Sequence, residues 1–328
     1  HTEIANVRIA NGTVFYRGAA PTRPAALVAL DPATGDAEEF YAPEEVALTA
    51  DDVAVAEAIT FPTGGGATAH GFFYAPRNAS WMAPDGDLPP LLVVGHGGPT
   101  AAATNALDLK IQFWTTRGFA VLDVDYRGST GFGRPYRDAL KGQWGVADVE
   151  DCVAGARHLV ARGLVDGARL AIRGSSAGGF TVLCALAFHD VFRAGASYYG
   201  IGDLEALARD THKFEAHYTD TLVGPWPERS DLYRERSPIH FVDRIACPLI
   251  VFQGLKDLVV PPSQAEAIVA ALRARHLPVA CITFPDEGHG FRDARNGRTA
   301  LEAELSFYAQ VFGFTPADAL PALTVENL

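Results

Sequence analysis

One serine stands in a setting that is typical of a catalytic nucleophile. Ser176 is the central residue of a G-x-S-x-G motif at 174–178, and the apolar run LAIRG (170–174) leads into it. This motif places a serine on a strained turn from a strand to a helix, where its neighbours must be small. The helix that follows would aim backbone N–H groups at a developing oxyanion, so Ala177 is predicted as one oxyanion donor. A tight turn without chemistry is the alternative interpretation of the motif alone.

A serine nucleophile needs a base, and the base needs a group that orients it. In hydrolases built around this motif, the acid and then the histidine follow the serine along the chain. Here Asp257 comes just after the apolar run LIVFQG (249–254), and His289 comes just after VACITFP (279–285). One helix and one strand separate them, so both are expected at the carboxyl edge of one parallel sheet. We predict Ser176, Asp257 and His289 as a catalytic triad.

Other residues compete for these roles. Asp286 and Glu287 are alternative acids, but they lie too close in sequence to His289 to face it from a neighbouring loop. Asp257 would otherwise be a helix cap ahead of Pro261 or a surface carboxylate. His289 would otherwise be a solvated loop histidine.

A glycine-rich loop at 96–99, His-Gly-Gly-Pro, follows the apolar run LLVVGH (91–96). In α/β-hydrolases the loop after the corresponding strand supplies a second oxyanion donor, and glycine lets the backbone approach a substrate carbonyl closely. The Gly98 N–H is therefore the predicted second donor. An ordinary glycine-rich loop is the alternative. A metal-binding role for His96 finds no partner at metal-ligand spacing nearby.

Strands and helices alternate from about Val53 onward, and this alternation predicts a doubly wound, mostly parallel sheet of the α/β-hydrolase type. The predicted strands are continuous apolar runs, as parallel strands buried on both faces should be. Residues 202–246 interrupt the alternation as an inserted cap would, and 63–71 are predicted as a loop. The expected strands lie at 91–96, 120–126, 170–174, 194–200, 249–254 and 279–285. The expected helices lie in the stretch before 117 and at 147–162, 177–188, 263–275 and 299–312.

The N-terminal segment differs in pattern from the rest of the chain. Two pairs of short alternating runs flank turn signals at Asn11-Gly12 and at 32–36, which predicts hairpins. Such short pairs cannot bury a core of their own and must pack on something else. We therefore divide the chain into a β-hairpin segment at 1–52 and a catalytic α/β-hydrolase domain at 53–328.

Composition excludes several classes of protein. The chain has 328 residues, of which 48% are hydrophobic and 20% charged, so it is neither disordered nor collagen-like. Its net charge of −12 argues against a nucleic-acid partner. No apolar run approaches the roughly 18 residues needed to cross a bilayer, and no signal peptide is visible, so we expect a cytoplasmic protein without a membrane partner. The cysteines are widely spaced among apolar neighbours and are expected as buried free thiols; they lie at 152, 184, 247 and 281.

Two further patterns carry weaker signals. The spaced glycines of YRGSTGFG (126–133) suggest a phosphate loop, but no G-x-x-x-x-G-K-[ST] motif accompanies them. His212, Glu215 and His217 cluster without the spacing of a helical ligand pair, so we expect a solvated or substrate-facing segment. We predict neither a metal nor a cofactor.

The sequence resembles the prolyl oligopeptidase family of serine peptidases, and within it the acylaminoacyl-peptidase and dipeptidyl-aminopeptidase-like subgroup. The resemblance covers residues 55–315, and its most specific part is a long segment that generic esterases do not share, DYRGSTGFGRPYRDALKGQWGVADVEDC (125–152). The other stretches that carry it are GHGGPT (95–100), RGSSAGGF (173–180), GLKDLVVPPSQ (254–264) and EGHGF (287–291).

The resemblance implies the same triad and the same two oxyanion donors. It also implies a hydrophobic S1 pocket, the pocket for the substrate side chain next to the scissile bond, walled partly by Tyr199 and Val260. Some family members carry a polar residue that grips the substrate two places after the triad acid. Here that place is Val259, which has no such group.

Family members normally carry a β-propeller before the hydrolase domain, where it acts as a size filter. Residues 1–52 match at most its last blade, and the sequence begins at His1 rather than Met. We therefore expect an excised catalytic domain whose propeller is missing from this chain.

The resulting prediction is a serine peptidase that cleaves short peptides, or aminoacyl and acyl-aminoacyl amides, from the N-terminal end through an acyl-enzyme. A carboxylesterase with the same triad is the alternative enzyme. A pseudo-peptidase used for protein interaction is the non-enzyme alternative, against which the intact triad argues. The residue preference at the scissile bond and the oligomeric state, a homo-oligomer included, are left open.

Overall fold

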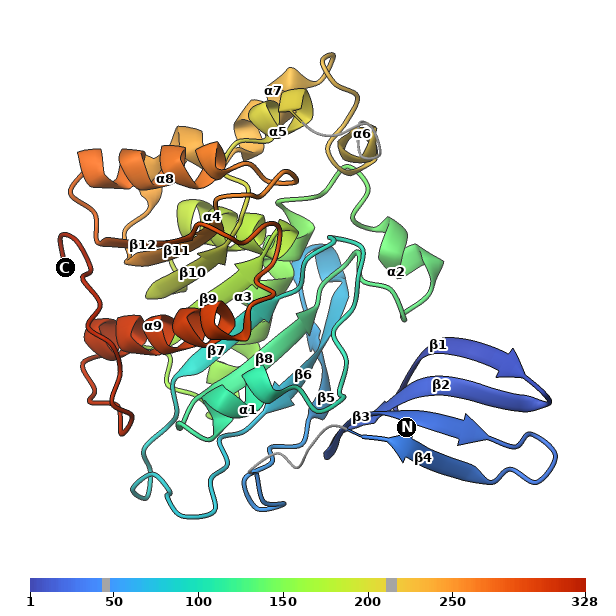
Figure 1. Ribbon diagram of the computed structural model, residues 1–328. Helices are drawn as coiled ribbons and strands as arrows, with labels where there is room; N and C mark the ends of the chain where they lie inside the picture. The colour runs from blue at the N-terminus through green and yellow to red at the C-terminus, as the bar shows by residue number, and fades with distance from the viewer. Residues whose placement is uncertain (43–47, 211–216) are drawn as a thin grey trace.

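The computed structural model describes residues 1–42, 48–210 and 217–328, and a mixed sheet forms its centre (Figure 1). The sheet has eight strands in the order β12-β11-β10-β9-β7-β8-β6-β5. Only β6 pairs antiparallel with its two neighbours; the other pairs are parallel. The strands are β5 (Glu57–Pro62), β6 (Thr68–Tyr74), β7 (Leu91–Gly95), β8 (Ala120–Asp125), β9 (Leu170–Ser175), β10 (Ala194–Tyr198), β11 (Leu249–Gly254) and β12 (Val279–Phe284).

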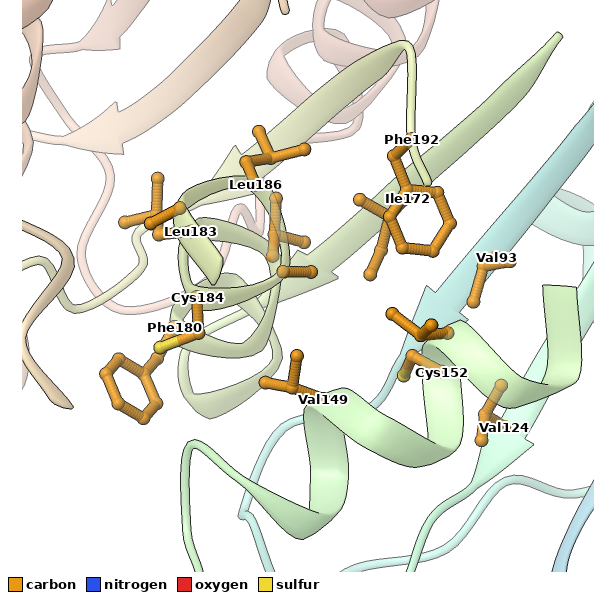
Figure 2. Close-up of a cluster of buried hydrophobic side chains, with 14 of the residues drawn as sticks. Val93, Val124, Val149, Cys152, Ile172, Phe180, Leu183, Cys184, Leu186 and Phe192 are labelled. Atoms are coloured by element: carbon orange, nitrogen blue, oxygen red, sulfur yellow. The ribbon is translucent and has the colours of Figure 1, made fainter. Parts of the chain in front are cut away.

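Helices cover both faces of this sheet, which confirms the predicted doubly wound α/β fold. One face packs against α3 (Ala147–Ala161), α4 (Ala177–Phe188) and α8 (Pro262–Ala274). The other packs against α1 (Leu109–Thr115) and α9 (Ala294–Phe312). Figure 2 shows part of the first core, where side chains of α3 and α4 gather around Val93 and Ile172 of the sheet. Among the helices of the described residues, none has the length and hydrophobicity to cross a membrane.

Short helices make up the predicted insertion between β10 and β11. The anchoring element is η2, which packs against both α4 and α8. Backbone hydrogen bonds also tie the insertion to the long loop after β8, because Gly142 and Trp144 donate to the carbonyls of Thr221 and Leu222. The short elements are α2 (Arg134–Asp138) in that loop, and α5 (Leu204–Asp210), α6 (Tyr218–Leu222), α7 (Ser230–Arg236) and η2 (Pro238–Arg244) in the insertion.

The N-terminal segment is a single four-stranded antiparallel sheet rather than two separate hairpins (Figure 1). The two predicted hairpins are present, and pairing of β2 with β3 joins them. The Leu107 N–H donates to the Ala20 carbonyl at 2.9 Å, which ties this sheet to the loop before α1. Its strands are β1 (Glu3–Ala10), β2 (Thr13–Ala20), β3 (Arg23–Leu30) and β4 (Ala37–Tyr41).

Several elements differ from those predicted, and β5 was not among the expected strands. The expected loop at 63–71 holds only the short helix η1 (Gly64–Gly66), after which β6 begins at Thr68. The glycine run masks this strand in the sequence, although Ala69, Gly71 and Phe73 alternate inward as a strand requires. Helix α9 begins at Ala294 instead of 299, because the Asp293 side chain caps it by accepting the Arg295 N–H at 2.9 Å.

One ionisable side chain of the central sheet lies against α1 and α9. Asp123 of β8 is partly buried, and burial raises its pKa from 3.8 to about 7. The neighbouring Asp125 carboxylate raises this pKa further, whereas the positive charge of Arg173 lowers it. The folded protein therefore holds the Asp123 proton more tightly than the unfolded chain does.

The Asp123→Asn variant should gain stability over the wild type as the pH rises. The raised pKa of Asp123 stabilises the folded protein fully below pH 3.8, and this stabilisation is lost as the pH rises through 7. We expect the melting temperature of the variant, relative to wild type, to be about 5–10 °C higher at pH 8 than at pH 5, for a change on the order of 2–3 kcal/mol. Asp166→Asn is the matched control. Hydrogen bonds from the Ala168 N–H and from Arg169 lower the pKa of Asp166, so this variant should instead lose stability at pH 8. If the melting temperatures of Asp123→Asn and wild type differed by the same amount at pH 5 and at pH 8, this would contradict the raised pKa of Asp123.

Candidate active site

Ser176 occupies a strained turn between β9 and α4. Its backbone has φ 56° and ψ −119°, a left-handed φ that non-glycine residues rarely adopt. The Ser176 N–H donates to the Tyr198 carbonyl of β10 at 2.9 Å, which holds the turn against the sheet. Two glycines of the motif permit this geometry by close approach: a Cβ on Gly174 would overlap the Gly178 carbonyl, and a Cβ on Gly178 would overlap the Gly95 carbonyl. The predicted nucleophile elbow is thus formed.

The three residues predicted as a triad lie together at the carboxyl edge of the sheet. His289 follows β12, and its Nε2 lies 2.8 Å from Ser176 Oγ. Its Nδ1 lies 2.8 Å from Asp257 Oδ2, in the loop after β11. The distances are those of hydrogen bonds, so this imidazole can accept a proton from the serine while the carboxylate orients it.

The Asp257 carboxylate is held by the chain that follows it. Its side chain is fully buried, and Oδ1 accepts the N–H groups of Val259 and Val260, each at 2.9 Å. One carboxylate oxygen therefore serves the local turn and the other faces the imidazole. This division fixes the rotamer of the acid before any substrate arrives.

The two alternative acids are engaged elsewhere. Asp286 pairs with Lys256 at 2.7 Å. Glu287 accepts the N–H groups of Arg292 and Asp293 and the side-chain amide of Asn296, each at 2.9 Å. These bonds close the loop that carries the histidine onto the start of α9. Sequence reasoning missed this clamp, because the contacts join residues that show no periodic pattern.

The glycine-rich loop lies directly against the elbow. A Cβ on Gly97 would meet the Ser175 carbonyl at 3.1 Å and the Ser176 Cβ at 3.7 Å. In the part of the chain that the structure describes, neither Gly98 nor Ala177 uses its N–H for an internal hydrogen bond. Ala177 opens α4, where the first N–H groups of a helix have no partner within it. Both N–H groups are thus available beside the serine.

A match to a protein-family model shows the family of this chain. Residues 105–315 match the model described as Prolyl oligopeptidase family. The chain belongs to the prolyl oligopeptidase family. The resemblance read from the motifs is thereby confirmed.

Named relatives agree with this membership. Dipeptidyl aminopeptidase BIII of Pseudoxanthomonas mexicana is 34% identical over 230 residues, which are 68% of this chain and 33% of the relative. A solved puromycin-hydrolyzing peptidase of Mycobacterium tuberculosis is 43% identical with a TM-score of 0.95, covering 98% of this chain and 49% of that one. A solved puromycin hydrolase is 40% identical with a TM-score of 0.96 and the same coverage. The chain thus spans a third to a half of the length of these relatives.

The segment at 125–152, the part most specific to the prolyl oligopeptidase family, contacts the glycine-rich loop at 96–99. The ring of His96 stacks on Tyr126 at 4.2 Å, and its Nε2 lies 2.7 Å from Ser129 Oγ. The Tyr126 hydroxyl lies 2.9 Å from the Pro99 carbonyl and 3.0 Å from the His96 carbonyl. Burial lowers the pKa of His96 to about 4, so the ring is neutral at pH 7. The neutral His96 ring therefore connects the glycine-rich loop to Tyr126 and Ser129.

The same segment also holds the helix that follows the serine. Asp148 accepts the Gly145 N–H at 2.7 Å and the Thr181 hydroxyl of α4 at 2.6 Å. Trp144 packs on Phe180 of α4 with ring centres 4.8 Å apart. The segment at 125–152 thus links the glycine-rich loop to α4. The sequence showed that the segment was specific, but not which partners it had.

The two predicted pocket residues have different surroundings. The Tyr199 ring lies 4.8 Å from the His289 ring and 5.4 Å from Phe291, with a left-handed φ of 39°. Val260 is only 2% exposed and packs in the core. It contacts the predicted triad through its N–H, which donates to Asp257 Oδ1. Their contact with a substrate stays a prediction.

The predicted absence of a metal meets one candidate cluster. Asp203, Glu205 and His240 place one ligand atom each within 4.8 Å of one another. Asp203 Oδ1 already accepts the Glu205 and Ala206 N–H groups at the start of α5, and His240 lies 3.6 Å from Glu205. Capping of α5 therefore accounts for Asp203, and the absence of a metal stays a prediction.

The earlier histidine cluster is only partly visible. His212 and Glu215 lie outside the described residues. His217 pairs with Asp220 at 2.9 Å.

Removing one hydroxyl should test the support of the glycine-rich loop. Tyr126→Phe keeps the stack on His96 but leaves the buried Pro99 carbonyl without its donor. We expect kcat/KM for a p-nitrophenyl ester to fall about tenfold, equivalent to about 1.4 kcal/mol of transition-state stabilisation.

Tyr136→Phe is the matched control for this variant. It also loses one hydroxyl bond of the same segment, the one to the Asp125 carbonyl, but that bond does not touch the loop. Its kcat/KM should stay within about twofold of wild type, since mutations off the loop leave the oxyanion donors in place. Equal losses in the two variants would show that Tyr126 acts through general stability alone.

Proposed function

We propose that this chain is the catalytic part of an exopeptidase that hydrolyses short peptides, or aminoacyl and acyl-aminoacyl amides, near their N-terminal end. The observation that carries the proposal is the continuous hydrogen-bond chain from Asp257 through His289 to Ser176, with both links at 2.8 Å. In this proposal Ser176 is the nucleophile, His289 the general base and acid, and Asp257 the orienting acid.

The proposed reaction is acyl transfer in two halves. His289 Nε2 takes the proton of the Ser176 hydroxyl as its oxygen attacks the scissile carbonyl carbon. The Gly98 and Ala177 N–H groups stabilise the negative charge that develops on the carbonyl oxygen. The C–N bond then breaks, and the leaving amine receives the proton from the imidazolium. Water, deprotonated by the same imidazole, attacks the acyl-enzyme and releases the acid and free Ser176.

Names of relatives support the substrate class. Relatives of this chain include a dipeptidyl aminopeptidase, acylamino-acid-releasing enzymes and puromycin hydrolases. All three names describe hydrolysis of small molecules or release of terminal groups rather than cleavage within long chains. For this chain we propose amide substrates with a short N-terminal acyl part, and a hydrophobic S1 pocket beside Tyr199.

A carboxylesterase would use the same triad, so the choice of leaving group separates the two activities. Turnover should be measured for an aminoacyl-naphthylamide and for a p-nitrophenyl acyl ester of similar acyl part. We expect both to be hydrolysed, with Ser176→Ala lowering both rates by more than about 10³-fold, as loss of a triad nucleophile does. Hydrolysis of the ester without the amide would refute the peptidase and leave the esterase.

We also propose that β1–β4 is the last blade of a β-propeller whose other blades lie outside this sequence. The sheet has open edges at β1 and β4, and Ile9 and Tyr41 on those strands are 75% and 64% exposed. Open edges with exposed apolar side chains are typical of a sheet that packs on others. A natural gene product that starts within a few residues of His1 would refute this assignment.

A further inference from the structure

A cavity lies behind the elbow, on the sheet face covered by α1 and α9. Its volume is about 570 Å³, within the range of small-molecule sites. Gly174 and Ser175 form part of its wall, and Tyr199 and Gly290 border it on the side of the catalytic histidine. Ser176 is not among its lining residues, so the cavity adjoins the reactive serine without containing it.

Acidic and basic side chains line this cavity, with Asp108, Lys110 and Arg292 around Asp123 and Arg173. Asp123 of β8 and Arg173 of β9 both line it, and both are paired in register with Val94 of the strand between them. Adjacent strands are about 4.8 Å apart, so the two side chains rise from the same face at points about 10 Å apart. No ion pair joins them within the residues that the structure describes. The gap between the charges is therefore open to a third group.

Arg173 is fixed in place by a buried partner. Its Nε lies 3.2 Å from Glu304 Oε1, and Glu304 in turn accepts the hydroxyls of Tyr198 and Tyr308. The guanidinium also lies 5.0 Å above the Tyr198 ring. Because the Nε of Arg173 contacts Glu304, the Nη nitrogens of Arg173 are the ones that can meet a ligand.

The carboxyl group of Asp123 lacks a protein donor. Among the described residues no group donates a hydrogen bond to it, and Asp123 is partly exposed where it lines the cavity. An ammonium group in the cavity would give this carboxyl group the donor that the protein does not supply.

We propose that the cavity binds a small zwitterion of the α-amino acid class, with its ammonium group at Asp123 and its carboxylate at Arg173. Asp123 and Arg173 line the same cavity on either side of Val94, so a ligand that carries both an ammonium and a carboxylate can meet both side chains at once. Apolar residues of the wall, Ile111 and Leu301 among them, can contact the ligand's side chain.

The binding itself does not depend on the proposed peptidase function, but its consequence rests on it. An exopeptidase releases free amino acids, which are the class of ligand that this cavity fits. The ligand would bind beside Tyr199 and Gly290, next to the catalytic histidine. Its occupancy would then report product concentration to the active site.

Calorimetric titration of the intact chain with L-leucine tests the proposal. Leucinamide, which keeps only the ammonium, and N-acetylleucine, which keeps only the carboxylate, are the two half-ligands. We expect saturable binding of leucine and at least tenfold weaker binding of each half-ligand. The titration is repeated after a fluorophosphonate has occupied the active-site serine, and leucine should still bind. Failure of the serine to react would count against the proposed function and not against the cavity.

Two variants locate the ligand. Asp123→Asn should weaken leucine binding at least tenfold, because it removes the carboxylate that would meet the ammonium group. Asp166→Asn, on the surface away from the cavity, should leave it unchanged. The absence of saturable binding would leave a cavity that holds only water and would overturn the proposal. Equal binding of a half-ligand, loss of binding on blocking the serine, or unchanged binding in Asp123→Asn would overturn it as well.

Discussion

The hydrogen-bond chain through His289 depends on one constraint, the ending of parallel strands at the same edge of a sheet. Ser176, Asp257 and His289 leave β9, β11 and β12 at their carboxyl ends, and β10 fills the space between. Most strand side chains are buried in the two cores, and the three residues lie just beyond the strand ends. The role of the strands is to set the spacing of three loops to within the reach of a hydrogen bond.

The elbow and the glycine-rich loop are further braced from one side by a single segment. At one end Tyr126 contacts the carbonyls of Pro99 and His96, and at the other Asp148 bonds to Thr181 of α4. The segment thus ties together the two elements that present the proposed oxyanion donors. Because a backbone donor must be in place before charge develops on a substrate, the proposed oxyanion role depends on this bracing. This gives a physical reason for the length and composition of 125–152.

Most of the architecture could be predicted because its signals are local. Continuous apolar runs marked the parallel strands, and the motif around Ser176 marked the start of α4, whose bounds at 177–188 match the prediction. The pairing of Asp257 with His289 followed from chain order and strand ends. The strand β6 was missed because a glycine run precedes it, and α9 began early because of a side-chain cap at Asp293.

What could not be predicted depends on register between distant strands and on side-chain direction. Asp123 and Arg173 face one cavity only because β7 aligns both with Val94, and nothing in the sequence shows that alignment. The clamp at Glu287 and the buried position of Val260 likewise follow from how loops close, which carries no periodic signal. The family model confirmed the membership that the motifs indicated, but the bracing contacts became visible only in three dimensions.

The most direct test of the central claim is to find which side chain a fluorophosphonate modifies. Ser175 and Ser176 are adjacent, so mapping the adduct by peptide mass spectrometry distinguishes an activated serine from its neighbour. The account predicts a single adduct on Ser176, formed at least about 10³-fold more slowly in His289→Ala, the loss expected when a triad base is removed. An adduct on Ser175, or an equal rate without His289, would contradict it.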